Sequence, residues 1–122
     1  MIAWLGMYDP PHVRTVNDQL WAGIRDALHD HGQEAPDGLD RRDDPWSVWN
    51  DADLILAQTC GLPYRDVLHD RTQLVGTPDY GVGGCPPGYY RSRIIVRADD
   101  IRETAAFHSA ALAYNDKANV SG

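Results

Sequence analysis

The sequence lacks long apolar runs and clusters of basic residues. None of its 122 residues belongs to an apolar stretch approaching the roughly 20 positions that a membrane-spanning helix needs, and no signal peptide is recognisable. Its 11 Lys and Arg face 18 Asp and Glu, which gives a formal net charge of −7. An acidic chain without a basic patch is a poor partner for a nucleic-acid backbone. We therefore expect one domain without membrane spans and without nucleic-acid binding.

Cysteine is scarce as well, because Cys60 and Cys85 are the only two. Two cysteines exclude a disulfide-rich scaffold, and they are too few for a structural zinc site without histidine ligands. They fall in loops that the predicted fold brings to one end of a sheet, so they can form one disulfide. The alternative, two reduced thiols, is favoured by the missing signal peptide. The histidine spacing indicates neither a metal site nor a catalytic base, so we expect no metal, no cofactor and no enzyme activity.

Strand-like and helix-like patterns alternate along the chain, as they do in α/β proteins. In the longest predicted helix, 13–31, apolar residues recur at three- and four-residue steps, and Gly32 stands where the helix should stop. We expect these residues to face the core: Val13, Val16, Leu20, Ile24, Ala27 and Leu28. Shorter helices are predicted with a start at Asp43-Asp44-Pro45 and an end before Ala52, over 63–69 and over 99–108. Strands are predicted over 2–6, 53–57, 72–76, 89–97 and 110–114, with at most a short edge strand within 33–41.

This order predicts a three-layer, mostly parallel sheet flanked by helices. We expect the four tryptophans, Trp4, Trp21, Trp46 and Trp49, to be core residues, because large aromatic side chains dominate burial in small domains. Ligands of such sheets bind beyond the carboxyl ends of the strands, where loops meet helix N-termini. The loops in that position are 7–9, 58–61 and 115–122.

Six short motifs follow one another along the chain. They are Leu-Gly-Met-Tyr-Asp at 5–9, Asn-Asp-Gln-Leu-Trp at 17–21, Gln-Thr-Cys-Gly-Leu-Pro-Tyr at 58–64, Val-Gly-Thr-Pro at 75–78, Tyr-Tyr-Arg-Ser at 89–92, and Tyr-Asn-Asp through Ser-Gly at 114–122. Together they resemble the amino-terminal part of phosphate/phosphonate-type ABC-transporter solute-binding proteins. The resemblance implies the first lobe of a bilobed type 2 periplasmic-binding fold that closes on its ligand. Residues 1–98 would form that lobe, and 99–122 the crossing segment and the start of a truncated second lobe.

The resemblance also implies the site and its partners. The ligand would be a small anionic or polar solute, an ABC permease would be the partner, and the location would be the periplasm; a true start at Met1, directly ahead of a strand, would instead indicate the cytoplasm. The same fold also serves as an effector-sensing or interaction domain of regulatory proteins, which is the alternative function. The resemblance places the ligand on Tyr8, Thr59, Tyr64, Tyr90, Ser92, Asn115 and Ser121, with Ser121 assigned to the oxyanion.

A chain that carries one lobe would leave one cleft wall exposed, with Tyr8, Tyr64 and Tyr90 near it. Exposed apolar patches of this kind drive association, so we expect homodimers that form through the cleft face. Sedimentation at high protein concentration should detect them, and a strict monomer would contradict the expectation.

Overall fold

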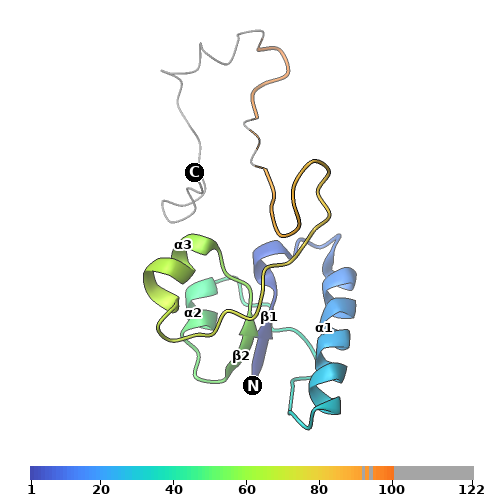
Figure 1. The fold of residues 1–122 in the computed structure, drawn as a ribbon, viewed down its shortest axis with the longest axis vertical. Helices are drawn as coiled ribbons and strands as arrows, with labels where there is room; N and C mark the ends of the chain where they lie inside the picture. The colour runs from blue at the N-terminus through green and yellow to red at the C-terminus, as the bar shows by residue number, and fades with distance from the viewer. Residues whose placement is uncertain (92, 94, 101–122) are drawn as a thin grey trace. The chain divides into compact units, whose positions relative to one another are not determined.

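The structure is a computed structural model that describes residues 1–91, 93 and 95–100. The chain divides into two compact units, Met1–Asp70 and Arg71–Gly122. The helices and strands of the described residues all belong to the first unit (Figure 1). The predicted boundary after residue 98 lies within the second unit and stays a prediction.

Two parallel strands form the sheet of the first unit. β1 (Ile2–Trp4) is buried along its whole length and pairs with β2 (Leu54–Ala57), with Trp4 opposite Ala57. Both strands were predicted, and the helices that accompany them make the first unit a small α/β structure. On the other edge of β1, the backbone N–H of Asp40 donates to the carbonyl of Ala3 at 2.8 Å. Residues 33–41 thus touch β1 at one point without forming a strand, within the limit that the sequence predicted.

Helix α1 (Arg14–Asp30) agrees with the prediction in its bounds. It ends before Gly32, whose φ of 72° is the left-handed conformation that terminates helices. The predicted core face is wrong in part, because Val16 and Leu20 are 61% and 53% exposed and Ala27 is exposed as well. The face of α1 that turns inward is centred on Trp21, which is 1% exposed, instead of on Leu20. It consists of Val13, Asn17, Trp21, Ile24 and Leu28.

The chain segment that follows α1 explains which face of the helix turns inward. The segment that follows the helix runs back along it, and the indole N–H of Trp21 donates to the carbonyl of Pro36 at 3.0 Å. Arg25 donates to the carbonyl of Asp37 at 3.1 Å, one residue further. Covering the largest side chain of the helix buries more apolar surface than covering Leu20 would, so Trp21 determines which face turns inward.

Helix α2 (Pro45–Trp49) begins as predicted. The carboxylate of Asp44 accepts hydrogen bonds from the backbone N–H groups of Trp46 and Ser47 at 3.0 and 3.2 Å, and Pro45 occupies the first helical position, where no N–H is needed. Trp46 and Trp49 lie on one face with their rings edge to face, 5.0 Å apart. Trp46 is nevertheless 38% exposed, so its predicted core position is wrong, because Trp49 fills the core beneath it.

A third helical stretch follows β2. It consists of α3 (Gly61–Pro63) and the π-helix η2 (Tyr64–Leu68), and it covers most of the predicted helix 63–69. The hydrogen bond from the N–H of His69 to the carbonyl of Tyr64, at 2.8 Å, spans five residues, as a π-turn requires. In Figure 1, α1 lies beside β1, whereas α2 and α3 lie on the β2 side of the strand pair.

Two tryptophans lie at the centre of the core of the first unit. The indoles of Trp4 and Trp49 meet edge to face with centroids 6.3 Å apart, an arrangement that aromatic pairs favour. Leu68 of η2, near the end of the first unit, also belongs to this cluster. The cluster comprises Ile2, Trp4, Val48, Trp49 and Leu68, with Met7, Leu54, Ala57 and Tyr64 packed against it.

The second unit is irregular over its described part. Residues 71–91, 93 and 95–100 include no helix and no strand, so the predicted strands over 72–76 and 89–97 are wrong for these residues. A β-rich sequence becomes a strand only when its backbone pairs in a ladder, and Val75 and Ile95 are 83% and 90% exposed instead. Apart from residues 99 and 100, the predicted helix 99–108 and strand 110–114 fall outside the described residues.

Among the described residues, no helix is long and apolar enough to cross a membrane. This agrees with the absence of long apolar runs in the sequence.

Gly6, in the short turn η1 (Gly6–Tyr8), permits a close approach of the Trp4 indole. A Cβ at Gly6 would lie 2.3 Å from that ring. We expect Gly6→Ala to lower the free energy of unfolding by about 1–3 kcal/mol through overpacking. Gly23 is the matched control, because it lies inside α1 with open space around it, and Gly23→Ala should raise stability by about 0.5–1 kcal/mol. Urea unfolding of both variants checks the opposite signs, and equal effects would contradict this account.

Candidate functional site

The carboxyl ends of β1 and β2 point to the same edge of the sheet because the strands are parallel. After β1 the chain enters η1, and after β2 it passes through Gln58–Cys60 into α3. Met7 of the first loop and Tyr64, which begins η2 after the second loop and α3, both pack against the same core cluster. The two loops therefore converge at one end of the first unit, which Figure 1 shows at the level of the α3 label.

Two of the predicted ligand residues, Tyr8 and Thr59, lie on these loops, and a third, Tyr64, begins η2 directly after α3. Tyr8 is 54% exposed, and its carbonyl accepts a hydrogen bond from the Asn17 side chain at 2.9 Å. Thr59 is half-buried and donates to the carbonyl of Cys60 at 3.2 Å. Tyr64 is also half-buried, because one side of its ring packs on the core. The structure thus brings these three predicted residues to the same edge.

The other predicted ligand residues are not placed beside them. Tyr90 is 59% exposed and belongs to the second unit. Ser92, Asn115 and Ser121 lie outside the described residues. Their assignment to the ligand stays a prediction.

A charged pocket that the sequence reasoning missed adjoins the loop after β1. It encloses a cavity of about 100 Å³ lined by Gly6, Asp9, Arg14, Arg41, Arg42 and Asp43. The Asp9 side chain, 9% exposed, contacts Arg41 at 3.0 Å, Arg14 at 3.6 Å and the Asn17 amide at 2.9 Å. The sequence contains one signal for this pocket, which is that Asp9 directly follows Tyr8. The pairing of Asp9 with Arg41 has no such signal, because the two residues are 32 positions apart.

These contacts determine the charge state of Asp9. Burial disfavours the charged carboxylate, but hydrogen bonds from Asn17 and Arg41, and the nearby charges of Arg41 and Arg14, outweigh it and lower the pKa of Asp9 below its ordinary 3.8. Arg41 also reaches Asp18 on α1 at 2.7 Å, and this hydrogen bond is the main cause of its raised pKa. Arg41 therefore joins the loop after β1 to α1.

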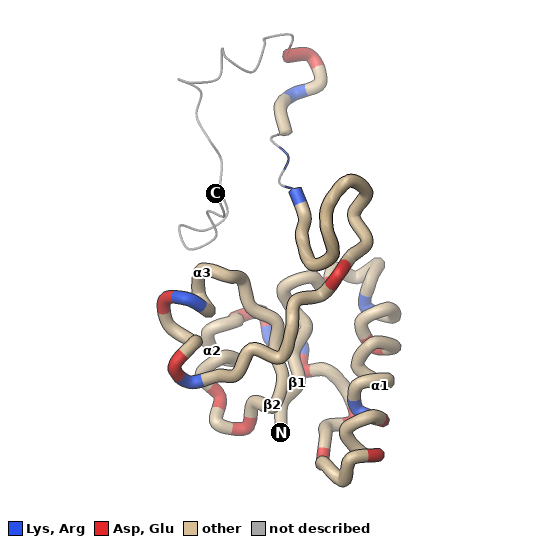
Figure 2. Tube along the Cα trace, in the orientation of Figure 1, with Lys and Arg blue, Asp and Glu red and all other residues tan. Residues whose placement is uncertain are grey.

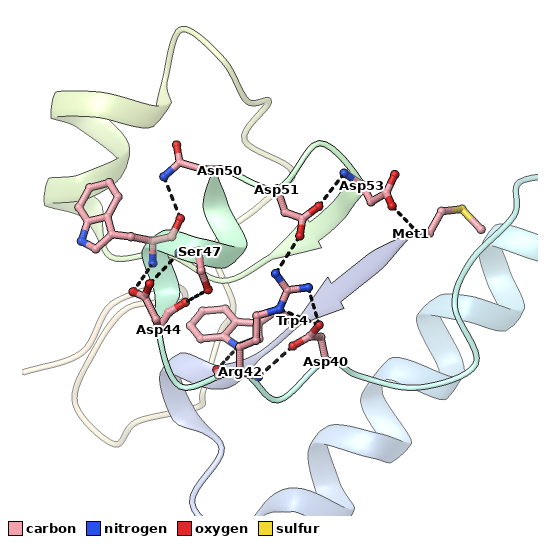
Figure 3. A network of polar contacts seen from close by, with 10 residues as sticks. Met1, Trp4, Asp40, Arg42, Asp44, Ser47, Asn50, Asp51 and Asp53 are labelled. Carbon is pink, nitrogen blue, oxygen red and sulfur yellow. Dashed lines mark hydrogen bonds and ion pairs between the residues drawn. The ribbon is translucent and has the colours of Figure 1, made fainter.

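Arg42 forms a second bridge, shown in Figure 3. Its guanidinium contacts Asp40 at 2.9 Å and Asp51 at 2.8 Å, and its carbonyl accepts the indole N–H of Trp4 at 3.0 Å. A backbone hydrogen bond from Arg42 is the main cause of the lowered pKa of Asp40, and the Arg42 side chain that of Asp51. Asp51 also accepts from the N–H of Asp53 at 3.0 Å, just before β2. Arg42 thus connects the segment before α2 to the start of β2.

The pocket braces the fold and is poorly suited to hold an anion. Arg41 and Arg42 each contact two carboxylates, so an incoming anion would have to displace those partners. Figure 2 shows acidic and basic residues interspersed over the first unit. Among the described residues, no group of three or more His, Cys, Asp or Glu is arranged to hold a metal ion.

Gln58 is the other residue that the sequence reasoning did not single out. It directly follows β2, and its side-chain oxygen Oε1 is buried with no hydrogen-bond partner among the described residues. A polar residue directly after a predicted strand was the available signal, but the isolation of its oxygen depends on tertiary packing. An unpaired buried acceptor is uncommon in folded proteins and marks the residue as worth explaining.

Both cysteines are free thiols in the structure. Cys60 is half-buried at the start of α3, and burial raises the pKa of its thiol, which makes it a weak nucleophile at neutral pH. Cys85 belongs to the second unit, so the disulfide between them stays a prediction.

Comparisons with protein-family models, curated proteins and solved structures found no match to this chain. The interpretation of the site therefore depends on the motifs of the sequence and on the geometry described above.

The lowered pKa of Asp9 makes the stability of the fold depend on pH in the acid range. Because its folded-state pKa lies below the unfolded value, Asp9 stabilises the fold above about pH 4, and that contribution is lost as pH falls through the folded pKa. We expect Asp9→Asn to be less stable than the parent at pH 7 and to approach it below pH 4. Urea unfolding across this range measures the difference, with Asp26→Asn on the exposed side of α1 as the control. A gap that stays constant with pH would contradict the role of Asp9.

Proposed function

We propose that this chain is the first lobe of a solute-binding protein of an ABC-type uptake system. Its ligand would be phosphate, a phosphonate or a related small polar anion, bound between this lobe and a second one in a type 2 periplasmic-binding fold. The observation that carries the proposal is that the loops bearing Tyr8 and Thr59, and Tyr64 at the start of η2, follow the carboxyl ends of two parallel strands. The motif resemblance supports the same edge.

The chemistry of the edge suits a small polar solute. Tyr8, which is 54% exposed, carries a phenol and Thr59 carries a hydroxyl, and both groups can hydrogen-bond a small oxyanion. With a formal net charge of −7, the chain attracts an anion through local dipoles rather than through its overall field. This favours a compact ligand that is held by a few directed hydrogen bonds.

The polar contacts of Asn17 and Arg41 support the proposal, because they hold the loop after β1 in place. Asn17 donates one hydrogen bond to the Tyr8 carbonyl and another to the Asp9 carboxylate, both at 2.9 Å. Arg41 holds the same carboxylate from the other side at 3.0 Å. A loop that is ordered before binding loses less entropy when the ligand arrives. These contacts therefore favour affinity without touching the ligand.

Titration of the labelled chain with phosphate and methylphosphonate, followed by NMR, tests the proposal. We expect binding weaker than about 1 μM, because one wall supplies only part of the contacts, with shift changes confined to 6–9 and 58–64. Tyr8→Ala should weaken binding about tenfold, since it removes an aromatic contact. Tyr89→Ala is the matched control, because Tyr89 is 68% exposed and is not among the predicted ligand residues.

Three outcomes would contradict the proposal. Shift changes that avoid both loops would place the ligand elsewhere. Equal losses in the two tyrosine variants would show that Tyr8 has no special role. Submicromolar binding by this chain alone would refute the two-walled site.

A further inference from the structure

We infer that the outer face of α1 is a self-association surface, on which a second copy of this chain packs with its own α1 antiparallel. This face, the outer stripe, consists of Val16, Leu20, Gly23 and Ala27. It lies on a different element from the loops after β1 and β2. The inference therefore goes beyond the proposed function and does not depend on it.

The outer stripe is apolar although it faces solvent. Val16 and Leu20 are 61% and 53% exposed, and a Cβ added at Gly23 would meet nothing within 4 Å. α1 packs on the fold through another side, centred on the buried Trp21, and Figure 1 shows it at the edge of the first unit, away from α2 and α3. A helix with apolar residues on two sides has the pattern of one that is covered on both. The described residues cover only the Trp21 side.

The spacing of the outer stripe suits a second copy of itself. Its members follow one another at steps of four, three and four residues, so the stripe reads the same from either end of the helix. An antiparallel neighbour places Val16 against the partner's Ala27. It likewise places Leu20 against the partner's Gly23, so that each large side chain meets a small one, as in ridges that pack into grooves. A parallel neighbour would set the two leucines against each other and the two glycines across a gap.

The charges at the ends of α1 also favour the antiparallel arrangement. Asp30 is exposed in the last turn, at the negative end of the helix dipole. At the other end, the N-cap Val13 makes no side-chain hydrogen bond and the first turn holds no acidic residue. An antiparallel neighbour brings Asp30 to this positive end and beside the partner's His12, whose imidazole carries an N–H in either charge state. A parallel neighbour would gather both Asp30 carboxylates at one end of the pair.

The size of the contact determines the expected affinity. Two helices that meet along this stripe bury less than the roughly 1,200 Å² of standard protein–protein interfaces, so the dimer should be weak. Each copy also has a formal net charge of −7, and the repulsion between copies is reduced at physiological salt. We expect a Kd between about 10 μM and 1 mM under those conditions.

Sedimentation equilibrium of the parent chain and of Leu20→Glu tests the surface. We expect the parent to dimerise and Leu20→Glu to raise the Kd about tenfold or more, because dimerisation would bury a carboxylate without a partner. Leu74→Glu is the matched control, since Leu74 is 57% exposed and belongs to the second unit, and it should dimerise like the parent. Both substitutions are at exposed positions, so circular dichroism should show an unchanged fold.

An isotope-filtered NOE experiment on a mixture of labelled and unlabelled chains tests the orientation. The antiparallel pair predicts an NOE between the methyl groups of Val16 in one copy and Ala27 in the other. Within one helix these two residues are about 16 Å apart, at a rise of about 1.5 Å per residue, so this signal arises only between copies.

Four results would overturn the inference. The first is a parent chain that stays monomeric up to about 1 mM. The second is a dimer that Leu20→Glu weakens no more than Leu74→Glu, which would place the contact on another face. The third is an NOE between the Val16 residues of two copies, which would show a parallel pair. The fourth is a set of NOEs, unchanged on dilution, that join the outer stripe to residues 101–122 of the same chain.

The proposed function stands or falls separately. Phosphate and methylphosphonate titrations test it, and a monomeric chain that binds phosphate through 6–9 and 58–64 would refute self-association and support the proposed function. A dimer through α1 that binds neither anion would do the reverse.

Discussion

Burial of the Trp4 indole is the interaction on which the first unit depends. The ring packs edge to face on Trp49, and its N–H donates to the carbonyl of Arg42. The Trp4 carbonyl accepts the N–H of Gln58, and the position two residues on must be Gly6, because the ring occupies the space of a side chain there. One residue of β1 thus connects α2, the segment before it and the end of β2. The placement of the loops after β1 and β2 follows from how this ring is packed.

The polar contacts act around that aromatic core in a different way. Arg41 and Arg42 are neighbours in sequence, yet each bridges a different pair of carboxylates, one toward α1 and the other toward β2. These pairs are partly exposed, so each one contributes little to stability by itself. Their effect is geometric, because they hold the irregular segment 33–44 against α1, against the loop after β1 and against the turn before β2.

Local sequence signals predicted the parts of the fold that local physics determines. The bounds of α1 follow from apolar spacing and Gly32, and the start of α2 from the carboxylate of Asp44. The inward face of α1 was not predictable in this way, because Trp21 is covered by a chain segment that only the folded structure brings there. The candidate site divides likewise: the loop positions were predictable from the parallel strands, whereas the Asp9 pocket and the isolated oxygen of Gln58 depend on contacts between distant segments.

The parallel pairing of β1 with β2 also has a consequence for synthesis on the ribosome. β1 emerges early, but its partner strand follows only after α1 and α2 have been made. During that interval the apolar segment from Ile2 to Leu5 has no strand to pair with and remains a target for chaperones.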